Sequence, residues 1–498
     1  MSTTTLFDRQ LAKLIVAVVM LAVSSCYDAR GEATGAPPLN FVFILVDDLG
    51  QRDLGCYGST FYETPNLDAL AQSGMRFTSA YSACQVCSPT RASIQSGKYP
   101  ARLHTTDYFG GPTRDEALVM PRFKHRRLLP PNYSEQLPLE EVTIAEALQE
   151  VGYATFFTGK WHLGPQGYWP EDQGYEINIG GNRAGHSKTY FSPYNNPKLT
   201  DGPAGEQLDE RLAHETVKFV NDHRDKPFLA FFSQFDVHLP LQTKPELKAK
   251  YAAKAKRWEG EAPTEPEFAK ERASNVRQIQ KHPVYAGMVE TMDAAVGIVL
   301  RGLEEAGVAD RTVVIFTSDN GGLSTAEGAP TSNLPFRGGK GWAYEGGLRV
   351  PLIIRWPGVT KPGSQCEDYI ISTDYYPTML DMAALPPRPE QHVDGKSFAP
   401  LLRDEAADFA RGPIYWHYPH YGNQGGVPAR AIRDGQWKLI EFMEDDTLEL
   451  YNLSDDLGEH RNLVATEPER VERMKNMLHD WCDSVGAQMP TPNPNHEP

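Results

Sequence analysis

The stretch Asn40-Phe41-Val42-Phe43-Ile44-Leu45-Val46-Asp47-Asp48 decides the fold class. Residues 41–46 are all apolar, which is typical of a strand that is buried on both faces of a parallel sheet. Two carboxylates follow at once. We therefore expect a central strand that delivers Asp47 and Asp48 to the sheet edge where ligands bind in open α/β folds.

Strand-like and helix-like segments alternate after this strand. Thr64-Pro65 predicts a helix with proline at its first position, and Gly74 predicts its end. Thr143-Ile144-Ala145-Glu146 has the spacing of a capping box, with a stop at Gly152. Short apolar runs recur at 154–158, 228–235 and 313–317, and a long helix is predicted over 285–306. This alternation predicts an α/β protein with a large, doubly wound mixed sheet sandwiched by helices.

Two regions depart from the alternation. Residues 242–282 are dense in Lys, Glu and Ala, which predicts a solvated helical insertion. After about Asp404 short strands are predicted at 429–432, 437–441 and 448–451, followed by a helix over 468–485. We therefore expect a main domain over 40–404 and a smaller C-terminal antiparallel α+β subdomain over 405–498.

Length and charge limit the function classes. A chain of 498 residues suits one large domain with a smaller one. Its net charge of −16 argues against nucleic acid as a partner, because a polyanion needs a basic surface. A small anionic substrate is not excluded, since local charges decide that contact.

The N-terminus predicts export. Arg9 and Lys13 precede the apolar run 14–23, which is too short for a permanent membrane span, so residues 1–26 are typical of a signal peptide and 27–39 of a linker. Val23-Ser24-Ser25-Cys26 resembles a bacterial lipoprotein processing site, and the alternative is an ordinary signal with an incidental cysteine. We expect a periplasmic, envelope-anchored or secreted protein, with membrane attachment through a lipidated Cys26 as one alternative. No later stretch is expected to cross a membrane.

Polar residues follow four of the predicted strands, and we expect them at one edge of the sheet. They lie at 47–48, 159–162 (Gly-Lys-Trp-His), 236–238 (Asp-Val-His) and 318–322 (Ser-Asp-Asn-Gly-Gly). Asp47, Asp48, Asp319 and Asn320 offer hard oxygen atoms, which favour calcium or magnesium over zinc. The alternative is that Asp47 and Asp48 cap the following turn, although adjacent carboxylates repel each other.

Cys87-Ser88-Pro89-Thr90-Arg91 gives the sharpest signal. Pro89 suits the first turn of a helix that ends at Gly97, so Cys87 is expected just before the helix, where backbone N–H groups favour an anion. Arg91 follows one turn later. From the residues alone, Cys87 is a thiolate nucleophile, a buried structural residue or half of a disulfide with Cys84. Pairings among Cys56, Cys84, Cys366 and Cys482 are also left open, and no zinc-type spacing occurs.

Cys-Ser-Pro-Thr-Arg-Ala-Ser at 87–93 is similar to the signature of formylglycine-dependent type I sulfatases, the arylsulfatase A-like members of the alkaline phosphatase superfamily. The resemblance covers about residues 40 to 460 in the family's order, through 47–48, 64–68, 159–164, 318–322, 337–340 and 345–351. It implies an alkaline phosphatase-like fold and the hydrolysis of sulfate monoesters.

The resemblance also implies a role for each matched residue. A formylglycine-generating or anaerobic maturation enzyme would convert Cys87 to formylglycine, which is hydrated to a gem-diol. One calcium ion would be bound by Asp47, Asp48, Cys87, Asp319 and Asn320. Arg91 and Lys160 would stabilise the gem-diol and the sulfate oxygens, His162 would act as a base, and His238 and Lys340 would hold the sulfate and assist the leaving oxygen. The alternatives are that Lys340 lies in a glycine-rich turn and that His238 caps a strand.

The expected substrate is a sulfated carbohydrate. Aromatic segments at 168–169, 190–194 and 415–418 offer flat faces for sugar rings, or else they pack in the core. His186 and Ser187 are further candidates for substrate contact. A hydrolase of phosphate mono- or diesters or phosphonates is the main alternative, and a catalytically inactive glycan-binding lipoprotein is another.

Overall fold

The computed structural model describes residues 37–257 and 266–497. The predicted signal peptide, most of the linker and Cys26 lie outside the described residues.

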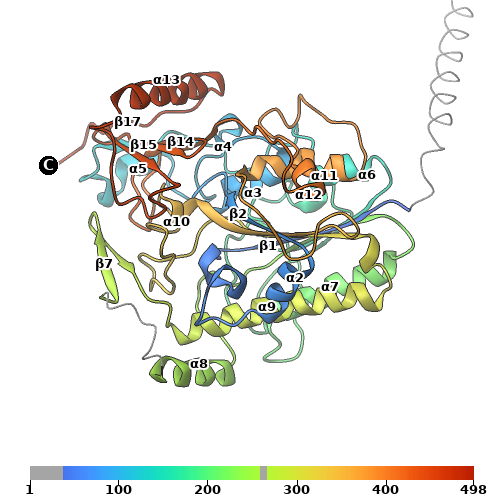
Figure 1. Cartoon of the computed structure of the whole chain (residues 1–498). Coiled ribbons are helices and arrows are strands. Elements are labelled where there is room, and N and C mark those ends of the chain that lie inside the picture. Colours follow the sequence, from blue (N-terminus) through green and yellow to red (C-terminus); the bar gives the residue numbers. More distant parts are fainter. Residues whose placement is uncertain (1–36, 258–265, 498) are drawn as a thin grey trace, which may run out of the picture. The chain divides into compact units, whose positions relative to one another are not determined.

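A nine-stranded mixed sheet forms the main body of the protein, as predicted (Figure 1). Its strands are β1 (Asn40–Val46), β2 (Met75–Tyr81), β4 (Ala154–Gly159), β5 (Ile177–Ile179), β6 (Phe228–Ser233), β9 (Thr312–Ser318), β10 (Arg349–Arg355), β11 (Ser364–Cys366) and β12 (Ile370–Ile371). Their order is β11-β2-β10-β9-β1-β6-β4-β5, with β12 paired to β2. The pairs are parallel except where β10 runs antiparallel to β2 and β9.

Helices cover both faces of this sheet because its central strand is apolar on both sides. Val42 and Ile44 of β1 enter one core cluster, whereas Phe41 and Phe43 enter the other. The first face is covered by α2 (Pro65–Ser73), α7 (Leu208–His223) and α9 (Pro283–Glu305). The second is covered by α3 (Cys87–Ser96), α6 (Ile144–Gln149), α11 (Tyr375–Met382) and α12 (Ala399–Arg403).

Helix ends follow the local signals closely. The Thr143 hydroxyl accepts a hydrogen bond from the backbone N–H of Glu146, and the Glu146 carboxylate accepts one from the N–H of Thr143, which confirms the capping box. Gly97 ends α3 in the left-handed conformation. Cys87 is the first residue of α3 rather than the residue before it, with Val86 as the cap.

Helix α9 departs from the expectation that no later stretch could cross a membrane. By length and composition, Pro283–Glu305 is long and apolar enough to do so. However, 67% of its apolar window is buried inside the protein. Its apolar composition therefore fits a helix that packs in the core against α2 and α7.

The segment 242–282 is only partly helical, so the prediction of a helical insertion was wrong for its second half. Helix α8 (Pro245–Arg257) is followed by a hairpin of β7 (Phe268–Glu271) and β8 (Ser274–Arg277). Val276 is buried and bridges to Thr325 on the main body. Composition did not reveal this contact, because Lys- and Glu-rich segments suit solvated hairpins as well as helices.

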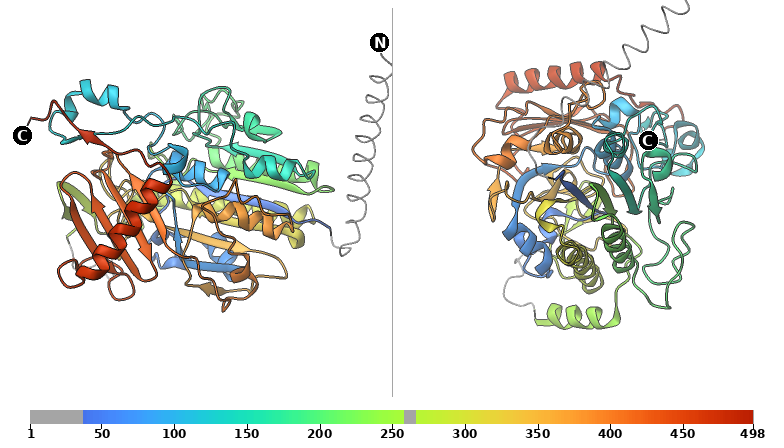
Figure 2. Two further views of the ribbon diagram at one scale, coloured as in Figure 1. Left: turned by 90° about the horizontal axis from the view of Figure 1, so that it is seen from above. Right: turned by 90° about the vertical axis from the view of Figure 1, so that its right-hand side faces the viewer.

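The C-terminal region contains a four-stranded antiparallel sheet, as predicted, with one strand more than expected. Its strands are β13 (Ile414–Tyr418), β14 (Ala429–Asp434), β15 (Trp437–Phe442) and β16 (Thr447–Asn452), in that order. Helix α13 (Pro468–Ser484) lies across this sheet (Figure 2). Met474 and Leu478 of α13 pack in the same core cluster as the strands.

Most of the aromatic residues proposed for sugar stacking belong to the core instead. Tyr190, Tyr194, Trp416 and Tyr418 are each at most 2% exposed. The cysteine pairings that the sequence left open are also not formed. Within the described chain, Cys56, Cys84, Cys87, Cys366 and Cys482 are all free thiols.

Candidate active site

The carboxyl ends of four adjacent parallel strands form the site. Strands β9, β1, β6 and β4 are neighbours in this order, so the residues that follow them meet at one edge of the sheet. Helix α3 adds Cys87 and Arg91, and the glycine-rich loop after β9 adds Lys340. The ten residues predicted for the site therefore come together: Asp47, Asp48, Cys87, Arg91, Lys160, His162, His238, Asp319, Asn320 and Lys340.

Three buried ion pairs organise the centre of this site. They are Lys160 Nζ–Asp47 Oδ2 at 2.6 Å, Lys340 Nζ–Asp48 Oδ2 at 2.7 Å and Arg91 Nε–Asp319 Oδ2 at 2.8 Å. Removing one partner of such a pair leaves a buried charge and typically costs about 3–5 kcal/mol. The carboxylates contact these cations rather than backbone N–H groups of the next turn, so the capping alternative for Asp47 and Asp48 is not what the geometry shows.

Two buried oxygen atoms of the centre are left without a partner in the described part of the chain. These atoms are Asp47 Oδ1 and Asn320 Oδ1. Ligand atoms of Asp47, Cys87 and Asp319 also lie within 4.8 Å of one another. Orphaned buried oxygens are costly unless something binds them, and carboxylate and amide oxygens are the ligands that calcium prefers. The residues therefore fit a calcium ion.

Burial and neighbouring charges shift the two adjacent carboxyl groups in opposite directions. Burial raises the pKa of Asp47 to about 8, although Lys160 opposes the shift and the Asp319 and Asp48 carboxylates add to it. Burial also acts on Asp48, but there the Lys340 ammonium outweighs it and holds the pKa of Asp48 below its usual range. Asp47 is thus the carboxyl group whose ionised form would gain most from a bound cation.

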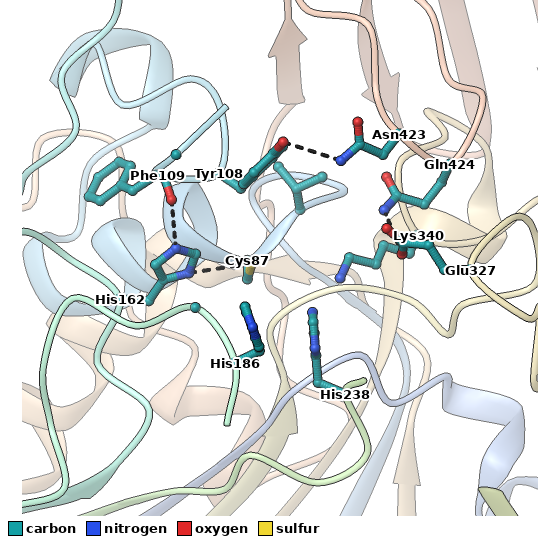
Figure 3. Close-up of a pocket in the computed structure, with 13 residues that line it drawn as sticks. Cys87, Tyr108, Phe109, His162, His186, His238, Glu327, Lys340, Asn423 and Gln424 are labelled. Carbon is teal, nitrogen blue, oxygen red and sulfur yellow. Dashed lines mark hydrogen bonds between the residues drawn. The ribbon is translucent and has the colours of Figure 1, made fainter. Parts of the chain in front are cut away.

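His162 lies between Cys87 and the backbone of Phe109. Its Nδ1 is 3.7 Å from Cys87 Sγ and 3.0 Å from Ser88 Oγ, and its Nε2 is 2.9 Å from the carbonyl oxygen of Phe109 (Figure 3). Because a carbonyl oxygen only accepts hydrogen bonds, Nε2 carries the proton and Nδ1 is the acceptor, within reach of both Ser88 Oγ and Cys87 Sγ. Burial, with the nearby Lys160, lowers the pKa of His162 well below its usual range, so the ring is a neutral base.

Cys87 itself is poorly suited to act as a thiolate. Burial raises the pKa of its thiol, and Lys160 and Lys340 only partly oppose that shift. It forms no disulfide with Cys84 and lines a cavity. The unmodified thiol is therefore neither an activated nucleophile nor a simple core residue.

Glycine places Lys160 in the site. Gly159 has φ +97°, and a Cβ atom on it would lie 1.7 Å from the carbonyl oxygen of Ser233, so no other residue fits here. The Lys160 backbone N–H donates to that same carbonyl at 2.9 Å, and the Lys160 carbonyl accepts from Arg91 Nη1 at 2.7 Å. The ends of β4 and β6 are thereby fixed beside α3.

Gly322 and Gly339 position Lys340 in a similar way, because they let two backbone segments approach closely. The Lys340 N–H donates to the carbonyl of Gly322 at 3.0 Å, and a Cβ atom on Gly339 would lie 2.4 Å from that oxygen. The close backbone approach brings the Lys340 ammonium to Asp48. The segment 338–341 is thus more than a turn.

A cavity of about 400 Å³ opens above Cys87. Of the predicted residues, it is lined by Cys87, His162, His186, His238 and Lys340. The rings of His186 and His238 stack with their centroids 6.1 Å apart, and His238 Nε2 lies 3.6 Å from Asp48 Oδ2. Ser187 is not part of this lining, and its hydroxyl donates to the Thr189 carbonyl at 2.6 Å.

Sequence reasoning missed the upper wall of this cavity. It consists of Tyr108, Phe109, Glu327, Asn423 and Gln424 (Figure 3). The Asn423 amide donates to the Tyr108 hydroxyl at 3.2 Å, and the Gln424 amide donates to the Glu327 carboxylate at 3.2 Å. These residues lie in loops without periodicity, and the only local signal was glycine on both sides of Asn423-Gln424.

Comparison with protein families gives two matches. The family described as "Sulfatase" matches residues 39–385, and the family described as "N-sulphoglucosamine sulphohydrolase, C-terminal" matches residues 338–485.

Individual relatives span nearly the whole chain. A sulfatase of Formosa agariphila is 33% identical, covering 89% of this chain and 88% of the relative. Human arylsulfatase A is 32% identical, and the match covers 90% of this chain and 88% of the relative. The solved structure of Ps i-CgsB in complex with k-i-k-neocarrahexaose is 26% identical, with a TM-score of 0.72 over 89% of this chain and 93% of that one.

Proposed function

Because the chain belongs to the sulfatase family and is a sulfuric ester hydrolase, we propose that it removes sulfate from monoesters of a carbohydrate, with residue 87 acting as a formylglycine. The observation that supports this most directly is the place of Cys87: it lies at the start of α3, beside the neutral Nδ1 of His162, and it lines the cavity.

Two groups would complete the site. A maturation enzyme would oxidise Cys87, and the hydrated formylglycine would supply a hydroxyl nucleophile that a serine or cysteine cannot match. A calcium ion held by Asp47, Asp48, Asp319, Asn320 and residue 87 would supply positive charge beside it. The carboxylates of Asp47, Asp48 and Asp319 already balance the charges of Lys160, Lys340 and Arg91. A bound calcium ion would therefore give the site an excess positive charge, which attracts a sulfate ester.

The chain's own residues divide the remaining work. Arg91 and Lys160 would hold oxygen atoms at the reaction centre, and Arg91 Nη2 has no hydrogen-bond partner among the described residues. His162 Nδ1 would take a proton from a hydroxyl on residue 87. Lys340 would remain a charged hydrogen-bond donor to the leaving oxygen, because the Asp48 carboxylate raises the pKa of Lys340 despite burial, and neutral His238 would hold the sulfate.

The upper wall suits a sugar better than a simple aryl group. Tyr108 and Phe109 offer aromatic surface, whereas Glu327, Asn423 and Gln424 offer hydrogen-bonding groups for hydroxyls. The related Ps i-CgsB was solved with a neocarrahexaose. Asn423 and Gln424 come from the proposed C-terminal subdomain (405–498), which would therefore contribute to substrate binding by the catalytic domain (40–404).

The proposed function is tested by two measurements on purified mature protein. Mass spectrometry of the peptide that contains residue 87 should show the aldehyde in place of the thiol. Sulfate release should be followed on galactose, N-acetylgalactosamine and N-acetylglucosamine monosulfates and on 4-nitrophenyl sulfate. An unmodified cysteine in protein that still turns over these esters would refute the formylglycine assignment.

Export is the remaining part of the proposal. Arg9, Lys13 and the apolar run 14–23 support a signal peptide, and Cys26 would be its lipidated first mature residue. In a Gram-negative host the full chain should partition into detergent, and Cys26→Ala should release it into the aqueous phase. If both forms are equally soluble, the lipid anchor is wrong and export alone survives.

A further inference from the structure

The cavity above Cys87 offers little free positive charge. Of the described residues that line it, Lys340 is the one lysine or arginine, and its ammonium is paired with Asp48. A second anion on the substrate would therefore meet no unpaired lysine or arginine in the described lining.

Glu327 brings a negative charge to the same cavity. It lies on the side away from His162, and its carboxylate accepts a hydrogen bond from the Gln424 amide at 3.2 Å (Figure 3). In the part of the chain that the structure describes, no lysine, arginine or histidine forms an ion pair with it. The exposed Glu327 carboxylate is thus an anion without a charged partner in the described wall of the cavity.

The loop that carries Glu327 is held in an unusual conformation. Ala326, Glu327 and Ala329 have φ values of 49°, 45° and 39°, which are unfavourable for residues other than glycine. The loop is fixed at both ends, because the Thr325 hydroxyl donates to the Gln424 carbonyl at 2.7 Å and Arg277 Nε donates to the Ala329 carbonyl. Strain of this kind persists only where the surroundings enforce it, and here it presents Glu327 to the cavity.

We propose that Glu327 is a specificity-determining residue that selects monosulfated sugars. This inference rests on the proposed function. The part of the ring that reaches Glu327 carries hydrogen-bond donors, such as hydroxyl groups, and a second sulfate or a carboxylate there is repelled. Gln424 keeps the carboxylate in place, and Tyr108 and Phe109 provide the apolar wall.

The test compares kcat/KM for N-acetylglucosamine 6-sulfate and galactose 6-sulfate with that for disulfated counterparts of the same sugars. The wild type should prefer the monosulfates. Glu327→Gln removes the charge but keeps the acceptor oxygen, and it should shift the ratio about three- to tenfold toward the disulfated sugars, as expected for one partly solvated charge. The wild-type preference should also shrink as salt is added, because exposed charges are screened.

Glu140→Gln is the matched control. Glu140 is exposed and does not line the cavity, so the same change in net charge there should leave the ratio unaltered. If Glu327→Gln is active and its ratio equals that of the wild type, this inference is overturned while the proposed function stands. A mature protein that releases sulfate from none of these sugars overturns both.

Discussion

The Nδ1 nitrogen of His162 faces the Sγ atom of Cys87 at 3.7 Å. The Phe109 carbonyl holds the proton on the opposite nitrogen, and burial keeps the ring neutral. The geometry therefore places a proton acceptor, His162 Nδ1, beside residue 87, which is the proposed nucleophile.

His162→Ala should lower kcat by about 10²- to 10⁴-fold, the usual contribution of a positioned base. The ion pairs Lys160–Asp47 and Arg91–Asp319 do not involve His162, so metal content should be unchanged. Steady-state kinetics and metal analysis on the same preparation check this. A variant with normal kcat would exclude His162 as the base.

Cys87→Ser, with the serine left unoxidised, should lose nearly all turnover, because serine supplies one hydroxyl where the hydrated formylglycine supplies two. Cys84→Ser is the matched control: Cys84 is also a buried free thiol and lies three residues away in sequence. It should retain activity and the modified residue 87. Sulfate release and peptide mass, measured together, distinguish the two variants, and the prediction fails if both behave alike.

Chelation should lower both activity and thermal stability, and calcium should restore them. A ligand present at 100 times its dissociation constant stabilises a protein by about 2.7 kcal/mol. Asp319→Asn should reduce the bound calcium, whereas Asp293→Asn should leave it unchanged. Asp293 is a buried carboxylate that accepts hydrogen bonds from the N–H groups of Asn66 and Leu67 at the start of α2. The Asp293→Asn variant therefore shows how much calcium is lost through a less stable fold alone. Stoichiometric zinc in purified protein would contradict the calcium assignment.

Gly159→Ala should destabilise the fold by more than about 2 kcal/mol, since it combines an unfavourable φ with a backbone collision at Ser233. Gly152→Ala is the control, because Gly152 also has a positive φ (+91°) but nothing lies within 4 Å of its added Cβ. The free energies of unfolding of both variants, measured with a denaturant, separate the effect of the backbone collision at Ser233 from the effect of the positive φ. Equal losses would show that the approach of β4 to β6 is not required.

The catalytic edge was predictable because its signals are local. An apolar run such as 41–46 predicts a buried strand whatever the rest of the chain does, and parallel strands bring their carboxyl ends together. Asp47, Lys160 and Asp319 could therefore be placed at one edge without knowledge of any contact between them.

The upper wall of the cavity was not predictable for the opposite reason. Tyr108 and Asn423 form a hydrogen bond across 315 positions of sequence, and neither lies in a helix or a strand. The position of the β7–β8 hairpin was not predictable either, because it depends on the long-range bridge between Val276 and Thr325. Contacts of this kind depend on the tertiary fold and leave no period in the sequence.

Asp107 gives a prediction about pH. Its carboxylate is 1% exposed and accepts hydrogen bonds from the Tyr418 hydroxyl and the Tyr108 N–H, both at 2.9 Å. Burial raises the pKa of Asp107 to about 7, although these hydrogen bonds oppose the shift. His420 Nδ1 lies 3.5 Å away, and burial keeps that ring neutral by lowering its pKa.

Since the pKa of Asp107 is higher in the folded state than its unfolded value of about 4, the folded protein holds a proton that the unfolded chain releases. The stability from this group is complete below pH 4 and is lost as pH rises toward 7. Asp107→Asn keeps an acceptor oxygen and does not titrate. The free energy of unfolding of the variant, minus that of the wild type, should therefore rise by at most about 1.4 kcal/mol per pH unit between pH 4 and 7, and level off above it. Urea unfolding at a series of pH values measures this difference, with Glu140→Gln expected to show almost none. A difference that stays constant across the same interval would show that Asp107 has its ordinary pKa in the folded protein, and one that falls would show a lowered pKa; either result contradicts the prediction.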